Sequence, residues 1–164
     1  MQLLVVRHAI AVDQEDWNGD DTKRPLTDEG RKKMKQATEG LRRVVETIDL
    51  IAASPLVRAQ QTAEILSDAY SVPIKTIPAL SPGQSPAALA DWLGGETRRR
   101  VVAVVGHEPG LSCAVSWFLT GSDSPIMEMK KGGVCLLDLS AGVGPGTASL
   151  LWLLWPSHLR QLED

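Results

Sequence analysis

The sequence is poor in several features that define common classes of protein, beginning with cysteine. Its two cysteines, Cys113 and Cys135, have neither C-x-x-C spacing nor partner histidines, which argues against a metal site. Both lie in apolar surroundings, so we expect small core residues in a reducing compartment. Long hydrophobic runs are also missing, because the longest one, residues 150–155, falls far short of the ~20 residues that span a bilayer.

The chain also lacks an excess of positive charge, with a formal net charge of -3. Its basic clusters contain no interleaved aromatic residues, which argues against nucleic acid and anionic membranes as partners. We interpret as solvated helix faces the clusters Lys32-Lys33-Lys35, Arg42-Arg43 and Arg98-Arg99-Arg100. No basic and apolar leader opens the sequence, so we expect a cytoplasmic protein that is neither secreted nor inserted in a membrane.

The length and composition favour one domain. The 164 residues are 43% hydrophobic and 23% charged, which is enough for one well-buried core and too little for two. We therefore expect a single domain over residues 1–164.

What the sequence does contain is a repeated layout, in which a short apolar run ends in residues that can bind an anion. The runs span residues 2–6, 50–53 and 101–105. Short aliphatic runs are typical of buried strands, and α/β proteins bind ligands at the carboxyl ends of such strands. The runs lead to Arg7 and His8, to Arg58, and to His107. If the strands are parallel neighbours, these four side chains form one cationic pocket that suits a phosphoryl group.

Helix signals lie between these runs and favour an α/β fold. Thr27 can cap a helix whose first turn carries Asp28 and Glu29, where carboxylates complement the helix dipole. Ser54 and Pro55 have the residue types of the N-cap and first position of a second helix. The sequence thus predicts that the second helix begins directly at the strand end, which places Arg58 in its first turn.

The remaining segments complete this expectation. The most hydrophobic run, residues 101–105, predicts a central strand, and the polar segment 9–24 predicts a surface loop beside the pocket. Residues 134–139 and 148–155 leave no room for a helix between them, so they predict an antiparallel hairpin at a sheet edge. We expect the tail, residues 156–164, to fray.

The strand-end residues belong to motifs, and together these motifs resemble the histidine phosphatase superfamily in its phosphoglycerate-mutase-like branch. Arg7-His8-Ala9 is similar to the R-H-G motif, residues 54–62 to S-P-x-x-R-A-x-Q-T, and Gly106-His107 to G-H. Residues 26–30 are similar to the L-T-x-x-G motif of the same family. The resemblance implies a three-layer α/β/α sandwich with a mostly parallel central sheet and an antiparallel edge.

The resemblance also implies a covalent mechanism without a metal or another cofactor. Neutral His8 would attack phosphorus and form a phosphohistidine intermediate, which water then hydrolyses. Arg7, Arg58 and His107 would hold the phosphoryl oxygens and stabilise the transition state. Their charges would also keep His8 unprotonated near neutral pH. Arg24, in the first loop, could reach the same phosphate.

One departure from the family points to the substrate. The family's usual leaving-group acid, a glutamate after the third strand, has no counterpart in residues 80–84, although Asp20, Asp21 or Asp91 could take its place. An imidazole leaving group needs no such acid, because with an ordinary pKa of about 6.5 it can carry its proton beforehand. The short connection 77–100 also leaves no room for a lid. These features resemble the bacterial SixA-type phosphatases, which dephosphorylate histidine in phosphorelay proteins.

Two alternatives stay open, and one further departure concerns the backbone. The chain could instead be a small-molecule phosphomonoesterase that uses a loop carboxylate as its acid, or a phosphate-binding module without turnover. A mutase is disfavoured, because the acid is missing and the chain is short. Ala9 replaces the glycine of the R-H-G motif, so a positive φ at this position would be costly.

Overall fold

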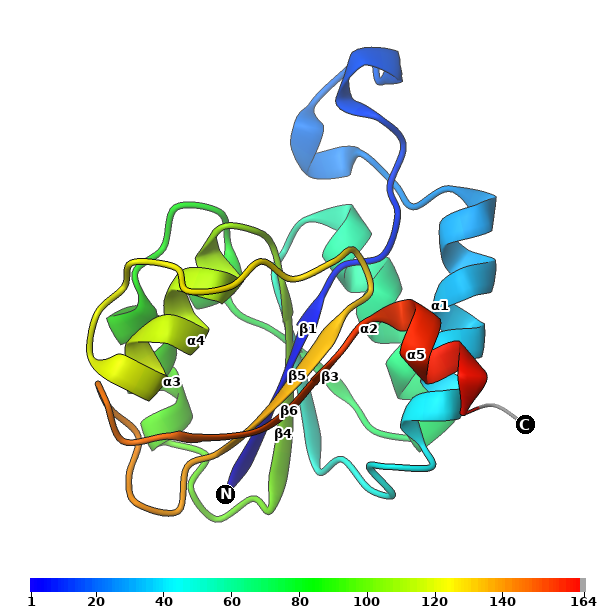
Figure 1. The fold of residues 1–164 in the computed structure, drawn as a ribbon. Coiled ribbons are helices and arrows are strands. Elements are labelled where there is room, and N and C mark those ends of the chain that lie inside the picture. The colour runs from blue at the N-terminus through cyan, green and yellow to red at the C-terminus, as the bar shows by residue number, and fades with distance from the viewer. Residues whose placement is uncertain (163–164) are drawn as a thin grey trace.

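The apolar runs of the sequence build one mixed sheet in the computed structural model, which describes residues 1–162 (Figure 1). The strands are β1 (Gln2–Arg7), β2 (Leu50–Ala53), β3 (Ile74–Thr76), β4 (Val101–Gly106), β5 (Val134–Asp138) and β6 (Ser149–Leu154). They lie in the order β3-β2-β4-β1-β5-β6. Strands β1 to β4 pair in parallel, whereas β5 runs antiparallel to both of its neighbours. The central place of β4 and the hairpin at the edge are therefore confirmed.

Helices cover both faces of the sheet, so the expected three-layer α/β/α sandwich is confirmed. The helices are α1 (Asp28–Leu41), α2 (Val57–Tyr70), α3 (Pro86–Gly94), α4 (Gly110–Thr120) and α5 (Pro156–Gln161). In Figure 1, α1, α2 and α5 lie on one face and α3 and α4 on the other. Side chains of β1 alternate between the two cores, with Leu4 and Val6 in one and Leu3 and Val5 in the other. No helix within residues 1–162 is long and apolar enough to cross a membrane.

The first helix begins where the sequence predicts. Thr27 is its N-cap, and the Thr27 hydroxyl accepts a hydrogen bond from the Gly30 amide at 2.9 Å. Gly30 also permits a close approach of the first loop, because a Cβ at this position would overlap the carbonyl oxygen of Ile10. The polar segment before the helix is a loop with two short 3-10 turns, Gln14–Asp16 and Asp21–Lys23. It rises above the carboxyl ends of the strands (Figure 1).

The second helix begins later than the sequence predicts. Its N-cap is Leu56, which makes no side-chain cap, so Ser54 and Pro55 precede the helix. The Ser54 hydroxyl lies 2.8 Å from Nε2 of His107, at the end of the neighbouring strand. The prediction is wrong because the Ser54 hydroxyl serves a tertiary partner, His107, and its local bond at 3.3 Å is from the Leu56 amide, which precedes the helix, rather than from an amide of the first turn.

The C-terminal segment is a helix, and the expectation of a frayed tail is wrong for its described part; residues 163–164 lie outside the described residues. Leu159 of α5 is fully buried against α1. A Cβ on Gly40 of α1 would overlap the carbonyl oxygen of Leu159, so the two helices meet at backbone distance. This helix has little signature in the sequence, because a six-residue segment is stabilised by packing rather than by its own periodicity.

The contact between α1 and α5 predicts that Gly40→Ala destabilises the protein. Alanine favours a helix interior, but its methyl group would force α5 away from α1. We expect a loss of about 1–3 kcal/mol in the free energy of unfolding, seen as a melting temperature lower by roughly 3–10 °C. Gly94→Ala is the matched control, because nothing lies within 4 Å of a Cβ at that helical position. Equal melting temperatures for the two variants would contradict the packing of α5.

Candidate active site

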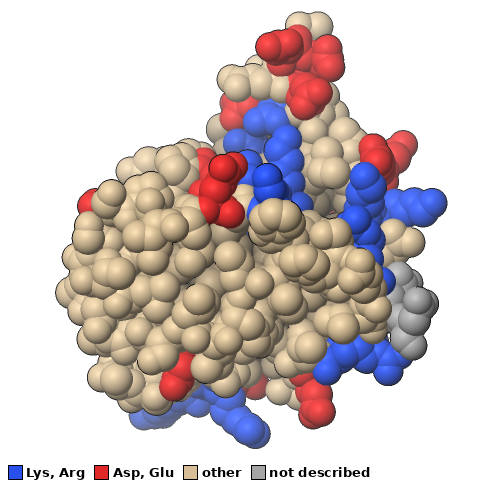
Figure 2. Space-filling view, viewed as in Figure 1, with Lys and Arg blue, Asp and Glu red and all other residues tan. Residues whose placement is uncertain are grey.

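The sheet brings the predicted residues to one edge, because β2, β4 and β1 are adjacent and parallel. Backbone hydrogen bonds continue past the strand ends: the His8 amide donates to the Gly106 carbonyl at 3.0 Å, and the Ser54 amide donates to that of Val105 at 3.0 Å. The residues that follow β1, β2 and β4 therefore begin at the same height along the carboxyl edge of the sheet. In Figure 2, basic side chains gather at the foot of the protruding first loop, whereas acidic side chains lie at its tip.

His8 is held as a neutral imidazole with a defined tautomer. Its Nδ1 lies 2.7 Å from the carbonyl oxygen of Ala9, which can only accept, so Nδ1 carries the proton and Nε2 keeps its lone pair. The side chain is buried, with 7% exposed. Burial lowers the pKa of His8 from 6.5 to about 4; the Ala9 bond opposes this, and the charges of Arg58 and Arg7 add to it. His8 is therefore a base with a free lone pair at neutral pH.

His107 lies beside His8, with ring centroids 5.1 Å apart. Its Nε2 is 2.8 Å from the Ser54 hydroxyl, which fixes the orientation of the ring. Burial, followed by the proximity of His8 and Arg58, lowers the pKa of His107 to about 3. Two uncharged imidazoles thus face a common space.

Arg58 is oriented by a carboxylate from the first loop. Its side chain is buried, with Nη1 donating to the Asp21 carbonyl at 2.9 Å and Nη2 to Oδ2 of Asp21 at 3.2 Å. The other oxygen of the carboxylate accepts from Nε of Arg24 at 2.8 Å, and Arg24 also donates to the Val12 carbonyl. The bond from Arg24, followed by the charges of Arg58 and Arg24, lowers the pKa of Asp21. The ionised Asp21 therefore bridges Arg58 and Arg24.

Arg7 completes the cationic group. Its Nη1 donates to the carbonyl of Met129 at 2.5 Å. Within residues 1–162, three buried nitrogens of the cluster have no hydrogen-bond partner: Nε of Arg7, Nε of Arg58 and Nδ1 of His107. A tetrahedral oxyanion could accept hydrogen bonds from the two guanidinium nitrogens and from a protonated His107, which is the chemistry of a phosphoryl site.

Thr62 connects the strand end to α2. Its hydroxyl accepts from the Ala9 amide at 3.0 Å and donates to the Arg58 carbonyl at 2.8 Å. The anticipated cost of a positive φ at Ala9 does not arise, because Ser71 is the only non-glycine residue within 1–162 that has one. An alanine therefore fits the R-H-G position of this chain without backbone strain.

Asp20 and Asp91, the other candidates for the leaving-group acid, are not placed to donate a proton in the cluster. Hydrogen bonding from Thr22, first by its side chain and then by its amide, lowers the pKa of the Asp20 carboxyl. Asp91 is exposed on α3. His158 stacks on Trp155 at the start of α5, outside the cluster. The sequence interpretation missed the roles of Ser54 and Thr62 as positioning residues, although both lie in the motif that it singled out.

A groove of about 430 Å³ opens beside His107. It is lined by the loop 79–86, by the turn 107–111 and by part of α4. Cys113 lies in this lining and is partly exposed, so the expectation of a core residue is confirmed only for Cys135. Glu108 also lines the groove; one of its carboxylate oxygens accepts from Ser112 at 2.5 Å, and the other is buried without a partner in residues 1–162.

The fold and the site define a phosphatase with a histidine pair at the carboxyl edge of its sheet. The chain belongs to the histidine phosphatase superfamily (branch 1), whose family model matches residues 3–81. It is 33% identical over 137 residues to an uncharacterized protein of Picosynechococcus sp., covering 82% of each chain. It is 26% identical over 168 residues to phosphohistidine phosphatase SixA of Escherichia coli, covering 99% of each.

Solved structures share the fold. The protein histidine phosphatase SixA complexed with tungstate superposes with a TM-score of 0.84 at 24% identity, covering 97% of this chain and 99% of that one. The alpha-ribazole phosphatase of Shigella flexneri superposes with a TM-score of 0.77 at 17% identity, covering 95% and 97%. The same scaffold is thus found in phosphatases with different substrates.

The lowered pKa values of His8 and His107 predict that stability depends on pH. Both lie below the usual 6.5, so the unfolded chain binds more protons in acid. Their contribution is fully present above this value and is lost as the pH falls toward about 4 and about 3. Between pH ~7.5 and ~4.5, we expect the free energy of unfolding from urea denaturation to fall by about 2 kcal/mol more in the wild type than in His107→Gln.

His158→Gln serves as the control for this measurement, because His158 is exposed and lies outside the cluster. It should show the pH dependence of the wild type. The same pH dependence in wild type and His107→Gln would mean that burial does not perturb His107.

Proposed function

We propose that the protein is a phosphohistidine phosphatase in which His8 is the nucleophile. The observation that carries this proposal is the Nδ1 bond of His8 to the Ala9 carbonyl, because it leaves Nε2 with a free lone pair inside a cationic site. The same bond fixes the direction from which this nitrogen meets a bound phosphoryl group.

In the first step, Nε2 of His8 attacks phosphorus in line with the leaving group. A new N–P bond forms, the substrate's P–N bond breaks, and its electron pair goes to the leaving imidazole nitrogen. Arg7 and Arg58 hold the phosphoryl oxygens and neutralise the charge that spreads over them. His107 becomes protonated as the oxyanion binds, because a dianion raises the proton affinity of an adjacent imidazole. Arg24 adds to the positive charge of the site and is held there by its ion pair with Asp21.

In the second step, water attacks the phosphohistidine on His8. The N–P bond breaks, inorganic phosphate leaves, and the electron pair returns to Nε2. Nδ1 keeps its proton in the bond to Ala9 throughout, so His8 acts through one nitrogen only.

Three observations favour phosphohistidine over a phosphate ester. The loop carboxylate nearest to Arg58, Asp21, is ionised and occupied by two arginines, so it is a poor proton donor to an alkoxide. The groove beside His107 is open and can admit a side chain from another protein. The relative that matches 99% of the chain is a phosphohistidine phosphatase. A phosphorelay or phosphocarrier protein is the expected partner.

One observation favours the alternative, a small-molecule phosphomonoesterase. Glu108 follows His107 directly and lines the same groove, and one of its carboxylate oxygens is buried without a partner in residues 1–162. Such a carboxyl could protonate an alkoxide leaving group. The structural similarity to an alpha-ribazole phosphatase agrees with this possibility.

A covalent intermediate on His8 is the first test. The enzyme, quenched with base during turnover of a ³²P-labelled phosphohistidine peptide, should carry acid-labile, base-stable phosphate. His8→Ala should lose this label and reduce kcat by about 10³-fold or more. The chain has three histidines, so His158→Ala is the matched control and should keep both label and activity. Label that persists in His8→Ala would disprove the assignment.

The choice of substrate is the second test. We expect kcat/KM for a phosphohistidine peptide to exceed that for sugar phosphates by about 100-fold, which corresponds to ~2.7 kcal/mol. Glu108→Gln should leave the phosphohistidine rate within about threefold of wild type. A preference for sugar phosphates that Glu108→Gln abolishes, and that Asp123→Asn in the same groove does not, would establish the alternative.

A further inference from the structure

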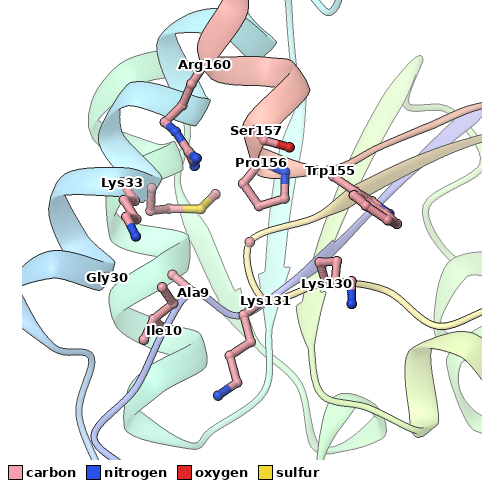
Figure 3. A pocket seen from close by; sticks show the side chains of 12 residues that line it. Ala9, Ile10, Gly30, Lys33, Lys130, Lys131, Trp155, Pro156, Ser157 and Arg160 are labelled. Carbon is pink, nitrogen blue, oxygen red and sulfur yellow. The ribbon is translucent and has the colours of Figure 1, made fainter.

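A second pocket, of about 230 Å³, lies next to the phosphoryl site and is lined by basic side chains (Figure 3). Lys33 of α1 and Arg160 of α5 lie on one side of it, and Lys130 lies across from them near Trp155. Lys131 contributes a fourth positive charge. The four cations come from three separate segments of the chain, so no single basic run in the sequence reveals them.

The charge of this pocket is of one sign. None of the lining residues within 1–162 is acidic, in a chain whose formal net charge is -3. Lys33 makes an exposed ion pair with Glu29, one helical turn earlier, at 2.6 Å. Exposed pairs of this kind are weak, so Lys33 remains available to another anion.

Trp155, the aromatic residue of the pocket wall, is contacted on its ring by two neighbours. The ring of His158 lies parallel to that of Trp155, with centroids 5.8 Å apart, and the Lys130 ammonium lies 5.3 Å from the Trp155 centroid. Trp155 is 44% exposed, so these contacts leave part of its ring open, and the four cations are what the pocket offers to a charged ligand. The pocket therefore selects its ligand by charge.

The pocket and the phosphoryl site share a wall. Ala9 and Gly132 line the pocket, and Ala9 follows His8 directly. The Gly132 amide donates to the carbonyls of both Arg7 and His8 at 3.1 Å. A protein that places a phosphohistidine against His8 therefore brings its neighbouring surface over Lys130 and Lys131.

We propose that this basic pocket binds acidic side chains that flank the phosphohistidine in the substrate protein. This inference rests on the proposed function and adds to it a determinant of partner choice. Charges placed beside a site accelerate encounter with a complementary partner and exclude partners of the same sign. The ligand is a carboxylate-bearing segment, held at the rim while the phosphoryl group enters between Arg7 and Arg58.

Two synthetic phosphohistidine peptides test this inference, one with glutamates and one with glutamines on either side of the phosphohistidine. We expect the wild type to favour the glutamate peptide in kcat/KM by about fivefold or more, through KM, since each exposed pair contributes a factor of about two to five. This preference should shrink as salt screens the charges. Lys130→Gln/Lys131→Gln and, separately, Lys33→Gln/Arg160→Gln should each reduce it.

Lys32→Gln/Lys35→Gln is the matched control, because it removes the same charge from exposed positions of α1 outside this pocket. It should keep the preference of the wild type. Hydrolysis of both peptides at equal rates by the wild type, or a preference that survives in both pocket variants, would overturn the pocket's role and leave the proposed function intact. Failure to hydrolyse either peptide, with phosphomonoesters turned over, would overturn the proposed function and this inference with it.

Discussion

The burial of two uncharged imidazoles among fixed guanidinium groups is the constraint on which the site depends. Removing an imidazole from water disfavours its protonated form, and neighbouring positive charges add to this effect. His8 and His107 have therefore lost their protons before a ligand arrives, at the expense of stability in acid. The hydrogen bond from His8 to the Ala9 carbonyl raises the pKa of His8 and so opposes the loss of its proton, yet the same bond selects the tautomer. Reactivity and orientation thus come from different contacts of one side chain.

The sheet supplies the precision that this arrangement needs. Adjacent parallel strands end at one level, and their backbone bonds extend to the first residues beyond, including His8 and Ser54. Thr62 then connects the end of β1 to α2 through one hydroxyl group. The proposed phosphoryl site is consequently built on regular elements, and the first loop protrudes above it.

The resemblance to the family predicted the three-layer fold, and the apolar runs predicted that four residues would meet, because such runs identify strands and parallel strands share a carboxyl edge. The sequence could not show which other polar groups would meet them. Ser54 bonds to a histidine 53 positions away, and Asp21 to an arginine 37 positions away. Local chemistry suggested a helix cap for Ser54 and a proton donor for Asp21, and tertiary packing decided otherwise. Helix α5 and the basic pocket beside it were missed for the same reason, since both are formed by contacts between segments that are distant in the sequence.

The tie between Asp21 and Arg58 has a consequence for affinity. Asp21 accepts one hydrogen bond from each terminal nitrogen of the guanidinium, so Nε and the remaining N–H groups of Arg58 are left to donate to a bound oxyanion. The rotamer entropy of this long side chain is lost when the protein folds and not when the ligand arrives. Pre-organisation of this kind lets a small anion bind without first ordering its receptor. In the proposed phosphoryl site, the first loop, whose carboxylate maintains that order, would therefore contribute to the affinity for phosphate.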